Sequence, residues 1–341
     1  MAMTGRERIE NLLAGKPADR VPFCPAVYEH KAALIGATPS DLSRDSGLFE
    51  RALVREIELY RADLVVVGCD VYNVEAEAAG CRVRFFGSND VPSISERIVR
   101  PGDDISRLRV PDPEKDGRMP VCLEAGRRIQ ARFGRDVIIR GALSAPFSMA
   151  CEMAGSENLL MAMVDDPAWV SQLLAYAAEV TKAYGRAFQK RGLGVVLFDS
   201  HASPPLVSPG LFRNIILAPT AAAIRYFRDD LDIPLVPYII GGDTTGLLDL
   251  ILETGTNNIL CDFRADLERF IARLTGTAVL LRANLDPRFL LAAPIAALKA
   301  RTRETLAVGR RFPGFLLGTG ILPYDIPPEK VIAVREAVEE N

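Results

Sequence analysis

The stretch PLVPYIIGGDTTGLLDLILETGTNNILCDFRADLERFIARLTGTAVLLRAN, residues Pro234–Asn284, decides the fold. Three short apolar runs in it alternate with two segments of helical periodicity, Leu247–Thr254 and Leu267–Leu274. Gly255 and Gly276 follow these two segments, where glycines that end helices are usually found. Strands that alternate with helices at this spacing predict βαβ units and a parallel sheet.

The same alternation extends over the rest of the chain. Eight apolar runs have strand length: Arg20–Pro25, Leu64–Asp70, Asp136–Gly141, Gly194–Ser200, Pro234–Gly241, Asn258–Asp262, Val279–Asn284 and Phe315–Gly320. A helix of roughly Gly5–Ala14 precedes the first run, and Ser208 and Pro209 have the N-cap and first-turn pattern of a later helix. Eight strand–helix repeats predict an α/β fold, a single (β/α)8 TIM barrel that spans residues 1–341 as one domain.

The longest interval between strands follows the second one. Cys81–Phe86 and Ser93–Arg100 alternate apolar and polar residues around a turn, which predicts a hairpin. Residues Pro101–Pro120 are rich in Pro, Asp and Gly and read as a surface connection. We therefore expect an insertion of about residues 81–120, either a partial lid on the barrel mouth or a peripheral decoration.

Composition excludes several classes of function. The net charge is −3, from 44 acidic and 41 basic residues without long blocks of one sign, which argues against a nucleic-acid partner. The six cysteines form no CxxC pair, which argues against a disulfide framework and a Cys-rich zinc site. The N-terminus has no signal-peptide pattern and the apolar runs are too short to cross a bilayer, so we expect a cytoplasmic protein without a membrane partner.

Polar residues at the strand ends are the candidate site, because TIM barrels carry their chemistry at the C-terminal ends of the strands. Carboxylates and an imidazole can exchange protons with a substrate, which makes catalytic candidates of Asp70, Asp199, His201 and Asp243. The substrate-binding candidates are Tyr72, Glu77, Cys261, Arg282 and Asn284. On an extended segment, Asp199 and His201 share one face and Ser200 lies on the other.

Structural roles compete with these functional ones. Asp243 can equally be an N-cap, Glu77 a solvated or capping acid, and Cys261 a small buried hydrophobe. Arg282 should face a carboxylate or an anionic group of the substrate, because an unpaired buried arginine is costly. For Arg140, at the end of the third strand, pairing with a neighbouring carboxylate is favoured over anion binding.

Four segments carry a resemblance to a known family. They are GRERIENLLAGKPADRVPF at Gly5–Phe23, VEAEAAGC at Val74–Cys81, FDSHASPPLVSPGLF at Phe198–Phe212 and GTGILPYDIPPEKV at Gly318–Val331. Together they resemble the uroporphyrinogen decarboxylase superfamily over nearly the whole chain. This resemblance implies a TIM barrel that either decarboxylates a tetrapyrrole or moves a methyl group from a corrinoid protein to a thiol or similar acceptor.

The chain resembles the cobamide-dependent methyltransferase branch more than the decarboxylase. The decarboxylase opens its first strand with an arginine-rich stretch, whereas Pro22–His30 (PFCPAVYEH) contains no arginine. The methyltransferases hold zinc through a His-x-Cys pair and a further Cys, and the matching positions here are Ile239, Gly241 and Ile321. None of these can ligate a metal.

A relocated zinc set of His201, Asp243 and Cys261 has suitable ligand types but no spacing motif, so we expect no metal.

The sequence-based hypothesis is a corrinoid-linked methyltransferase without the usual zinc. Its cofactor is methylcobalamin or another corrinoid, free or on a corrinoid-binding partner protein, and its substrate is a small-molecule methyl acceptor. A carboxy-lyase that acts on a porphyrinogen or another acid is the alternative, with Arg140 and Arg282 as its cationic clamp. A second alternative is a non-catalytic corrinoid- or ligand-binding partner. The resemblance also implies a homodimer.

Overall fold

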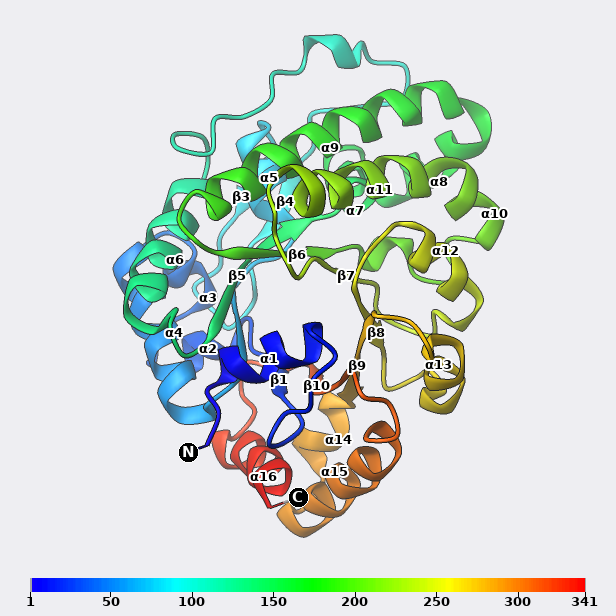
Figure 1. Cartoon of the computed structure of the whole chain (residues 1–341). Helices are drawn as coiled ribbons and strands as arrows, with labels where there is room; N and C mark the ends of the chain where they lie inside the picture. The colour runs from blue at the N-terminus through cyan, green and yellow to red at the C-terminus, as the bar shows by residue number, and fades with distance from the viewer. Residues whose placement is uncertain (1, 341) are drawn as a thin grey trace.

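Eight parallel strands form the barrel predicted from the sequence (Figure 1). The computed structural model describes residues 2–340. The strands are β1 Phe23–Ala26, β2 Leu64–Val67, β5 Ile138–Ser144, β6 Gly194–Phe198, β7 Pro237–Ile239, β8 Asn258–Cys261, β9 Leu280–Leu285 and β10 Phe315–Ile321. They pair in the order β1-β10-β9-β8-β7-β6-β5-β2. Each overlaps one of the eight predicted runs, so the TIM-barrel prediction is confirmed.

One backbone hydrogen bond and polar side chains join β1 to β2, where the ladder of strand pairing is interrupted. Pro25 in β1 has no N–H to donate to a neighbouring strand. The Asp63 backbone N–H donates to the Phe23 carbonyl (2.9 Å), and the Phe23 N–H donates to Asp63 Oδ2 (2.6 Å). Lys31 Nζ donates to the Val66 carbonyl of β2 (2.9 Å). The barrel is therefore nearly closed, with polar side chains along this seam.

Helices surround the barrel on its outside, except that α1 lies across one end of it (Figure 1). They are α1 Gly5–Leu13, α2 His30–Ala33, α3 Pro39–Leu42, α4 Ser46–Tyr60, α5 Asn73–Ala78, α6 Met119–Phe133, α7 Pro146–Ala154, α8 Ser156–Asp165, α9 Pro167–Gln189, α10 Pro209–Leu211, α11 Leu217–Arg225, α12 Leu248–Glu253, α13 Leu267–Leu274, α14 Pro287–Ala292, α15 Ile295–Gly309 and α16 Pro328–Glu339. The Ser208 hydroxyl accepts from Leu211 N, and Gly255 and Gly276 both have a φ of +84°, as their predicted capping roles require. No helix in residues 2–340 is both long and apolar enough to cross a bilayer.

The barrel interior is filled in layers. Ile9 of α1 packs against Leu64, Leu280 and Leu316 at the N-terminal end of the strands, and Figure 1 shows α1 in front of the ring of strands. A second apolar cluster occupies the other end of the interior and contains Ala26, Tyr28, Val196, Phe198, Ile239 and Leu260. The N-terminal end is thus closed, which leaves the C-terminal end as the accessible mouth.

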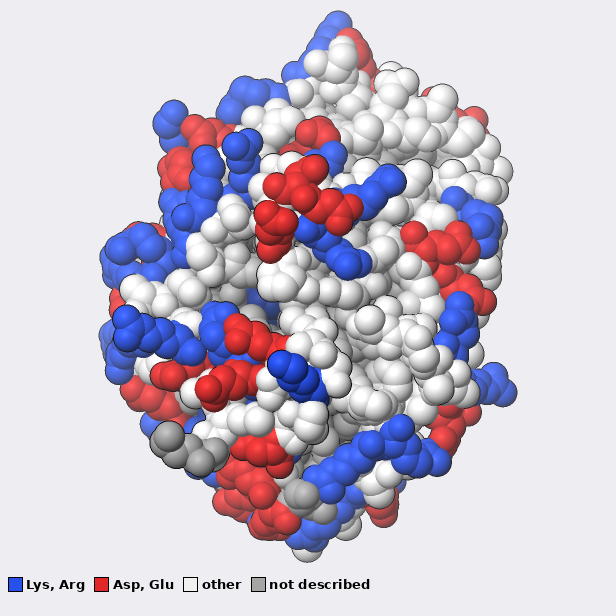
Figure 2. Space-filling model, viewed as in Figure 1, with Lys and Arg blue, Asp and Glu red and all other residues white. Residues whose placement is uncertain are grey.

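The segment between β2 and β5 contains an antiparallel hairpin, β3 Arg82–Arg84 with β4 Ser93–Glu96. The connection that follows packs on the outer helix α9, where Trp169 Nε1 donates to the Asp103 carbonyl and Tyr176 Oη to the Arg109 carbonyl (both 3.0 Å). This connection therefore covers the helix layer. Acidic and basic side chains are interspersed on the face shown in Figure 2, in agreement with the mixed charge of the sequence.

Candidate active site at the barrel mouth

Strand alternation directs Asp199 away from the barrel interior. In β6, Val196 and Phe198 belong to the interior cluster, whereas Val195 and Leu197 pack in the core cluster outside it. Asp199 continues the outward set and is fully buried. A 3-10 helix, Ser200–Ala202, starts directly after it, so the extended geometry that would place Asp199 and His201 on one face is absent.

The Asp199 carboxylate connects three elements. It accepts hydrogen bonds from Ser148 N (2.8 Å) and Ser148 Oγ (2.7 Å) of α7, and from Tyr238 Oη (2.6 Å) of β7. Burial raises the pKa of Asp199 to about 6 despite these hydrogen bonds. Ser148 Oγ also accepts from His201 N (3.3 Å). Asp199 therefore supports the loop that carries His201.

Tyr72, Ser200 and His201 lie together at the mouth. Tyr72 Oη donates to Ser200 Oγ (2.8 Å) and accepts from Ser200 N (3.0 Å). The Tyr72 and His201 rings meet edge to face, with centroids 5.5 Å apart. Tyr72 has a φ of +82°, a conformation that costs energy for a bulky residue and is concentrated at functional sites. The ends of β2 and β6 thus bring a phenol, a hydroxyl and an imidazole to one place.

The His201 imidazole lies beside a carboxylate of α7. Its Nε2 lies 3.4 Å from Glu152 Oε1 of α7, and its Nδ1 is buried without a hydrogen-bond partner among residues 2–340. Burial lowers the pKa of His201 and raises the pKa of Glu152. Burial thus favours the uncharged ring, and a ring nitrogen without a partner can accept a proton.

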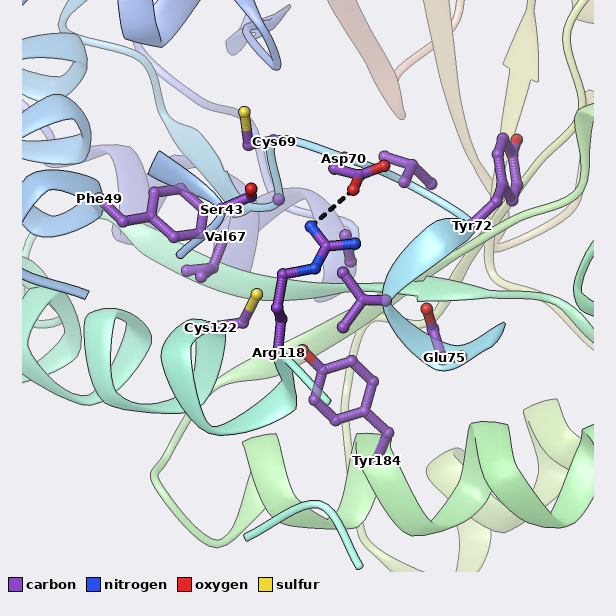
Figure 3. Close-up of a pocket in the computed structure, with 14 residues that line it drawn as sticks. Ser43, Phe49, Val67, Cys69, Asp70, Tyr72, Glu75, Arg118, Cys122 and Tyr184 are labelled. Carbon is purple, nitrogen blue, oxygen red and sulfur yellow. Dashed lines mark hydrogen bonds and ion pairs between the residues drawn. The ribbon is translucent and has the colours of Figure 1, made fainter. Parts of the chain in front are cut away.

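Asp70 lies beside the mouth in a buried ion-pair network. Arg118 Nη1 donates to Asp70 Oδ2 (2.7 Å), and Arg118 Nε contacts Glu77. Asn73 Nδ2 donates to Asp70 Oδ1 (2.5 Å). Figure 3 shows Asp70 and Arg118 pointing toward one another, with Tyr72 on the far side of Asp70. Burial raises the pKa of Asp70, while the Arg118 charge opposes that rise.

Replacing Arg118 with methionine is expected to lower the free energy of unfolding by about 3–5 kcal/mol, because it leaves Asp70 and Glu77 without their cation. Arg127 is a matched control on the same helix, since it pairs with Glu124 on the surface and Arg127→Met should cost below about 1 kcal/mol. Urea denaturation of both variants measures the difference. Equal, small effects would show that the network contributes no stability.

Asp243 and Cys261 are not part of this cluster. Asp243 Oδ1 accepts from Thr245 N (3.0 Å) and Thr245 Oγ1 (2.6 Å), and these hydrogen bonds lower the pKa of the exposed Asp243. Asp243 thus holds a local turn, and Thr244, not Asp243, is the N-cap residue of the 3-10 helix Thr245–Leu247. Cys261 packs on the outer side of β8, and burial raises its pKa to about 12. The structure therefore does not bring Cys261 to His201.

Asp262 is the carboxylate that sequence reasoning missed in this part of the barrel. A β-carbon placed on Gly241 would lie 3.6 Å from Asp262 Oδ2 and 3.9 Å from Ser200 Oγ, so these groups surround Gly241. Asp262 is 8% exposed, and burial raises its pKa. Alternation from Leu260, which faces the interior, was the available signal for Asp262.

The residues of this chain do not fit a zinc ion. Ile239, Gly241 and Ile321, which correspond to the zinc ligands in the resemblance, offer no donor side chain. Residues 2–340 contain no group of three or more His, Cys, Asp or Glu side chains that could hold a metal.

Arg140 and Arg282 lie inside the barrel without the carboxylate partners that the sequence led us to expect. Arg282 Nη2 donates to the Thr319 carbonyl (3.1 Å), and no carboxylate in residues 2–340 pairs with it. The carboxylate partner expected for Arg140 is also missing: its Nε is buried without a hydrogen bond in the part of the chain that the structure describes. Asn284 Oδ1 is likewise buried and unpartnered there.

A parallel barrel with titratable side chains at its mouth defines the chain as a TIM-barrel protein with an enzyme-like site. The family model described as uroporphyrinogen decarboxylase (URO-D) matches residues 4–341, so the chain belongs to the uroporphyrinogen decarboxylase family.

Known relatives fall into the two enzyme classes expected from the sequence. The chain is 27% identical to a uroporphyrinogen decarboxylase of Pelobacter propionicus, with 95% of this chain and 96% of that protein covered. It is 25% identical to a methylcobamide:CoM methyltransferase of Methanosarcina barkeri, with 99% and 98% covered. A solved methyltransferase from Methanosarcina mazei superposes with a TM-score of 0.88, at 25% identity and 99% coverage of both chains. The family resemblance is confirmed, and both enzyme classes occur among the relatives.

Proposed function

We propose that this single-domain barrel transfers a methyl group between a corrinoid and a small acceptor without zinc. The main support is the similarity to the Methanosarcina mazei methyltransferase over 99% of both chains. The absence of arginine from Pro22–His30 is a second argument, because a tetra-acidic macrocycle would lack its clamp on the first strand. The corrinoid is free or carried by a partner protein.

The residues at the mouth have distinct proposed roles. Methylcobalamin, when bound, would supply the methyl group and leave as cob(I)alamin, because both electrons of the cobalt–carbon bond stay on cobalt. His201 accepts the proton that the acceptor loses, and Glu152 orients the ring. Tyr72 and Ser200 provide hydroxyl groups that orient the acceptor, and Asp262 lines the same space.

The other carboxylates act by positioning. Asp199 supports the His201 loop through Ser148. Asp70, held by Arg118, fixes the segment that leads into Tyr72. Asp243 holds the turn after β7 through its hydrogen bonds to Thr245.

Incubation of the purified protein with methylcobalamin and a panel of thiols, amines and pterins tests the proposal. With at least one acceptor, the absorbance of methylcobalamin should convert to that of demethylated cobalamin at a rate proportional to enzyme concentration. Unchanged absorbance with every acceptor, in a protein that gives a cooperative melting transition, would contradict methyl transfer from free methylcobalamin.

A carboxy-lyase is the second candidate, favoured by the two interior arginines and the decarboxylase relatives. Release of carbon dioxide from uroporphyrinogen, lost in Arg282→Ala, would support it. A folded protein that binds cobalamin tightly but shows neither reaction would instead be a non-catalytic binding partner.

A further inference from the structure

Two buried arginines line the same space inside the barrel. Arg140 of β5 is 3% exposed and Arg282 of β9 is 7% exposed. Both line one small cavity, together with Cys24, Tyr28 and Glu56. Strand alternation places the Arg140 side chain in the interior. In β5, its neighbours on the same face are Ile138 and Ala142, which pack against the two interior apolar clusters.

Glycines on the adjacent strands make room for both side chains. A β-carbon on Gly318 of β10 would lie 2.3 Å from Arg282 Nε and 2.7 Å from Asn284 Oδ1. A β-carbon on Gly194 of β6 would lie 3.2 Å from Arg140 Cγ. Any other residue at position 318 would displace the guanidinium, so the interior is shaped around these arginines.

The charges in this region do not balance. Among the described residues that line the cavity, Glu56 has the one carboxylate, and that carboxylate lies 3.4 Å from Lys31 Nζ. Neither Arg140 nor Arg282 has an ion pair within residues 2–340, and the Nε of each is buried without a hydrogen bond. This region therefore contains three cationic side chains, Lys31, Arg140 and Arg282, and one carboxylate, that of Glu56.

Burial and the nearby Arg282 charge lower the pKa of Arg140 to about 10, which still leaves Arg140 charged at pH 7. A buried charge without a partner costs several kcal/mol, so a fold that keeps two of them is suited to an anion that neutralises them.

We propose that the cavity between Arg140 and Arg282 binds one carboxylate group of the methyl acceptor. The planar guanidinium fork matches the two oxygens of a carboxylate. Asn284 Oδ1, on the same face of β9 and nearer the mouth, accepts a hydrogen bond from an N–H or O–H of the same ligand. That this ligand is the methyl acceptor rests on the proposed function, whereas the carboxylate site rests on the unpaired arginines.

The apolar layer nearer the mouth constrains the rest of this ligand. Ala142 of β5 pairs in register with Val196 of β6, and both belong to the interior cluster beyond Arg140. The part of the ligand beside its carboxylate therefore meets apolar side chains, which favours an apolar group at that position.

Thermal unfolding with acetate as the probe tests the site without any turnover. Acetate should raise the melting temperature saturably, whereas neutral acetamide should not, at ionic strength held constant with sodium chloride. Arg140→Met and Arg282→Met should abolish the acetate shift, and exposed Arg310→Met, at the opposite end of the barrel, should retain it.

Without acetate, Arg140→Met should also melt about 2 °C or more above the wild type, because it removes an unpaired buried charge. A structurally paired arginine would give the opposite sign. If the methionine variants do not fold, Arg282→Lys replaces them in the test. It keeps the charge but loses the planar fork, and it should weaken acetate binding about tenfold. Equal shifts with chloride and acetate, or an acetate shift that survives in Arg140→Met, would overturn the proposal.

Turnover separates this inference from the proposed function. If methyl transfer occurs, Arg282→Lys should lower kcat/KM about a hundredfold for a carboxylated acceptor and leave its amide analogue unchanged. Acetate binding without methyl transfer would retain the site and reject the proposed function. Methyl transfer without acetate binding would retain the proposed function and reject the carboxylate site.

Discussion

His201→Gln should lower kcat/KM for methyl transfer by about 10²–10⁴-fold, the usual contribution of a general base. The glutamine side chain is similar in size and polar, but it cannot take up the proton that the acceptor releases. Because burial lowers the pKa of His201 below its usual 6.5, the active neutral form persists through pH 7. The wild-type rate should therefore be constant above pH 7 and fall only when the pH drops below this lowered pKa.

The pH profile of kcat/KM distinguishes this role from a structural one. His201→Gln should remove the acidic limb along with most of the rate, while its melting temperature stays near that of the wild type. Glu152→Gln should keep most of the activity but shift the limb to lower pH, because it removes the carboxylate 3.4 Å from His201 Nε2. An acidic limb that persists in His201→Gln would assign the proton transfer to another group.

Asp199→Ala should lower the free energy of unfolding by about 3–5 kcal/mol. The substitution leaves three buried donors unpaired, two of Ser148 and one of Tyr238. Asp243→Ala is the matched control, because its carboxylate is exposed and serves only a local turn, and it should cost about 1 kcal/mol or less. Chemical denaturation measures both, and similar values for the two variants would contradict the bracing role of Asp199.

The cost of Asp199→Ala should also depend on pH. The folded-state pKa of Asp199 is raised to about 6, above the 3.8 of an exposed aspartate, so the folded state binds the proton first as the pH falls. Stability from this group therefore increases as the pH falls from about 6 toward 3.8 and is lost as the pH rises through 6. The variant should lose about 1 kcal/mol more at pH 5 than at pH 7.5. A cost that is larger at pH 7.5 would contradict the raised pKa.

The fold could be predicted because its signal is local. Strand-length apolar runs alternate with helical segments throughout, and each run became one strand of the barrel. The break between α8 and α9 is also local: Asp166 caps Trp169 N and Pro167 starts the second helix. The seam at β1 and β2 depends instead on side chains distant in sequence, such as Asp63 and Lys31, and no periodicity shows it.

The site could be predicted only in part, for reasons that differ between residues. Tyr72 and His201 lie in the loops that follow β2 and β6, and the barrel brings these loops together. The extended geometry assumed for Asp199 fails because a 3-10 helix begins at Ser200. Arg118 lies at the end of the insertion, 48 residues from its partner Asp70, and no local pattern joins them.

The unpaired state of Arg140 and Arg282 was also hidden from the sequence. An absent counter-ion becomes visible only when every neighbour of a buried charge is placed.

Transfer of a trideuterated methyl group tests the central claim most directly. The protein is incubated with trideuteromethyl-cobalamin and a thiol that carries a carboxylate, and the products are analysed by mass spectrometry. The account predicts a thioether that contains the CD3 group in the wild type and little of it in His201→Gln. Unlabelled thiol after prolonged incubation with folded wild-type protein, together with carbon dioxide release from uroporphyrinogen, would contradict methyl transfer and identify the chain as a decarboxylase.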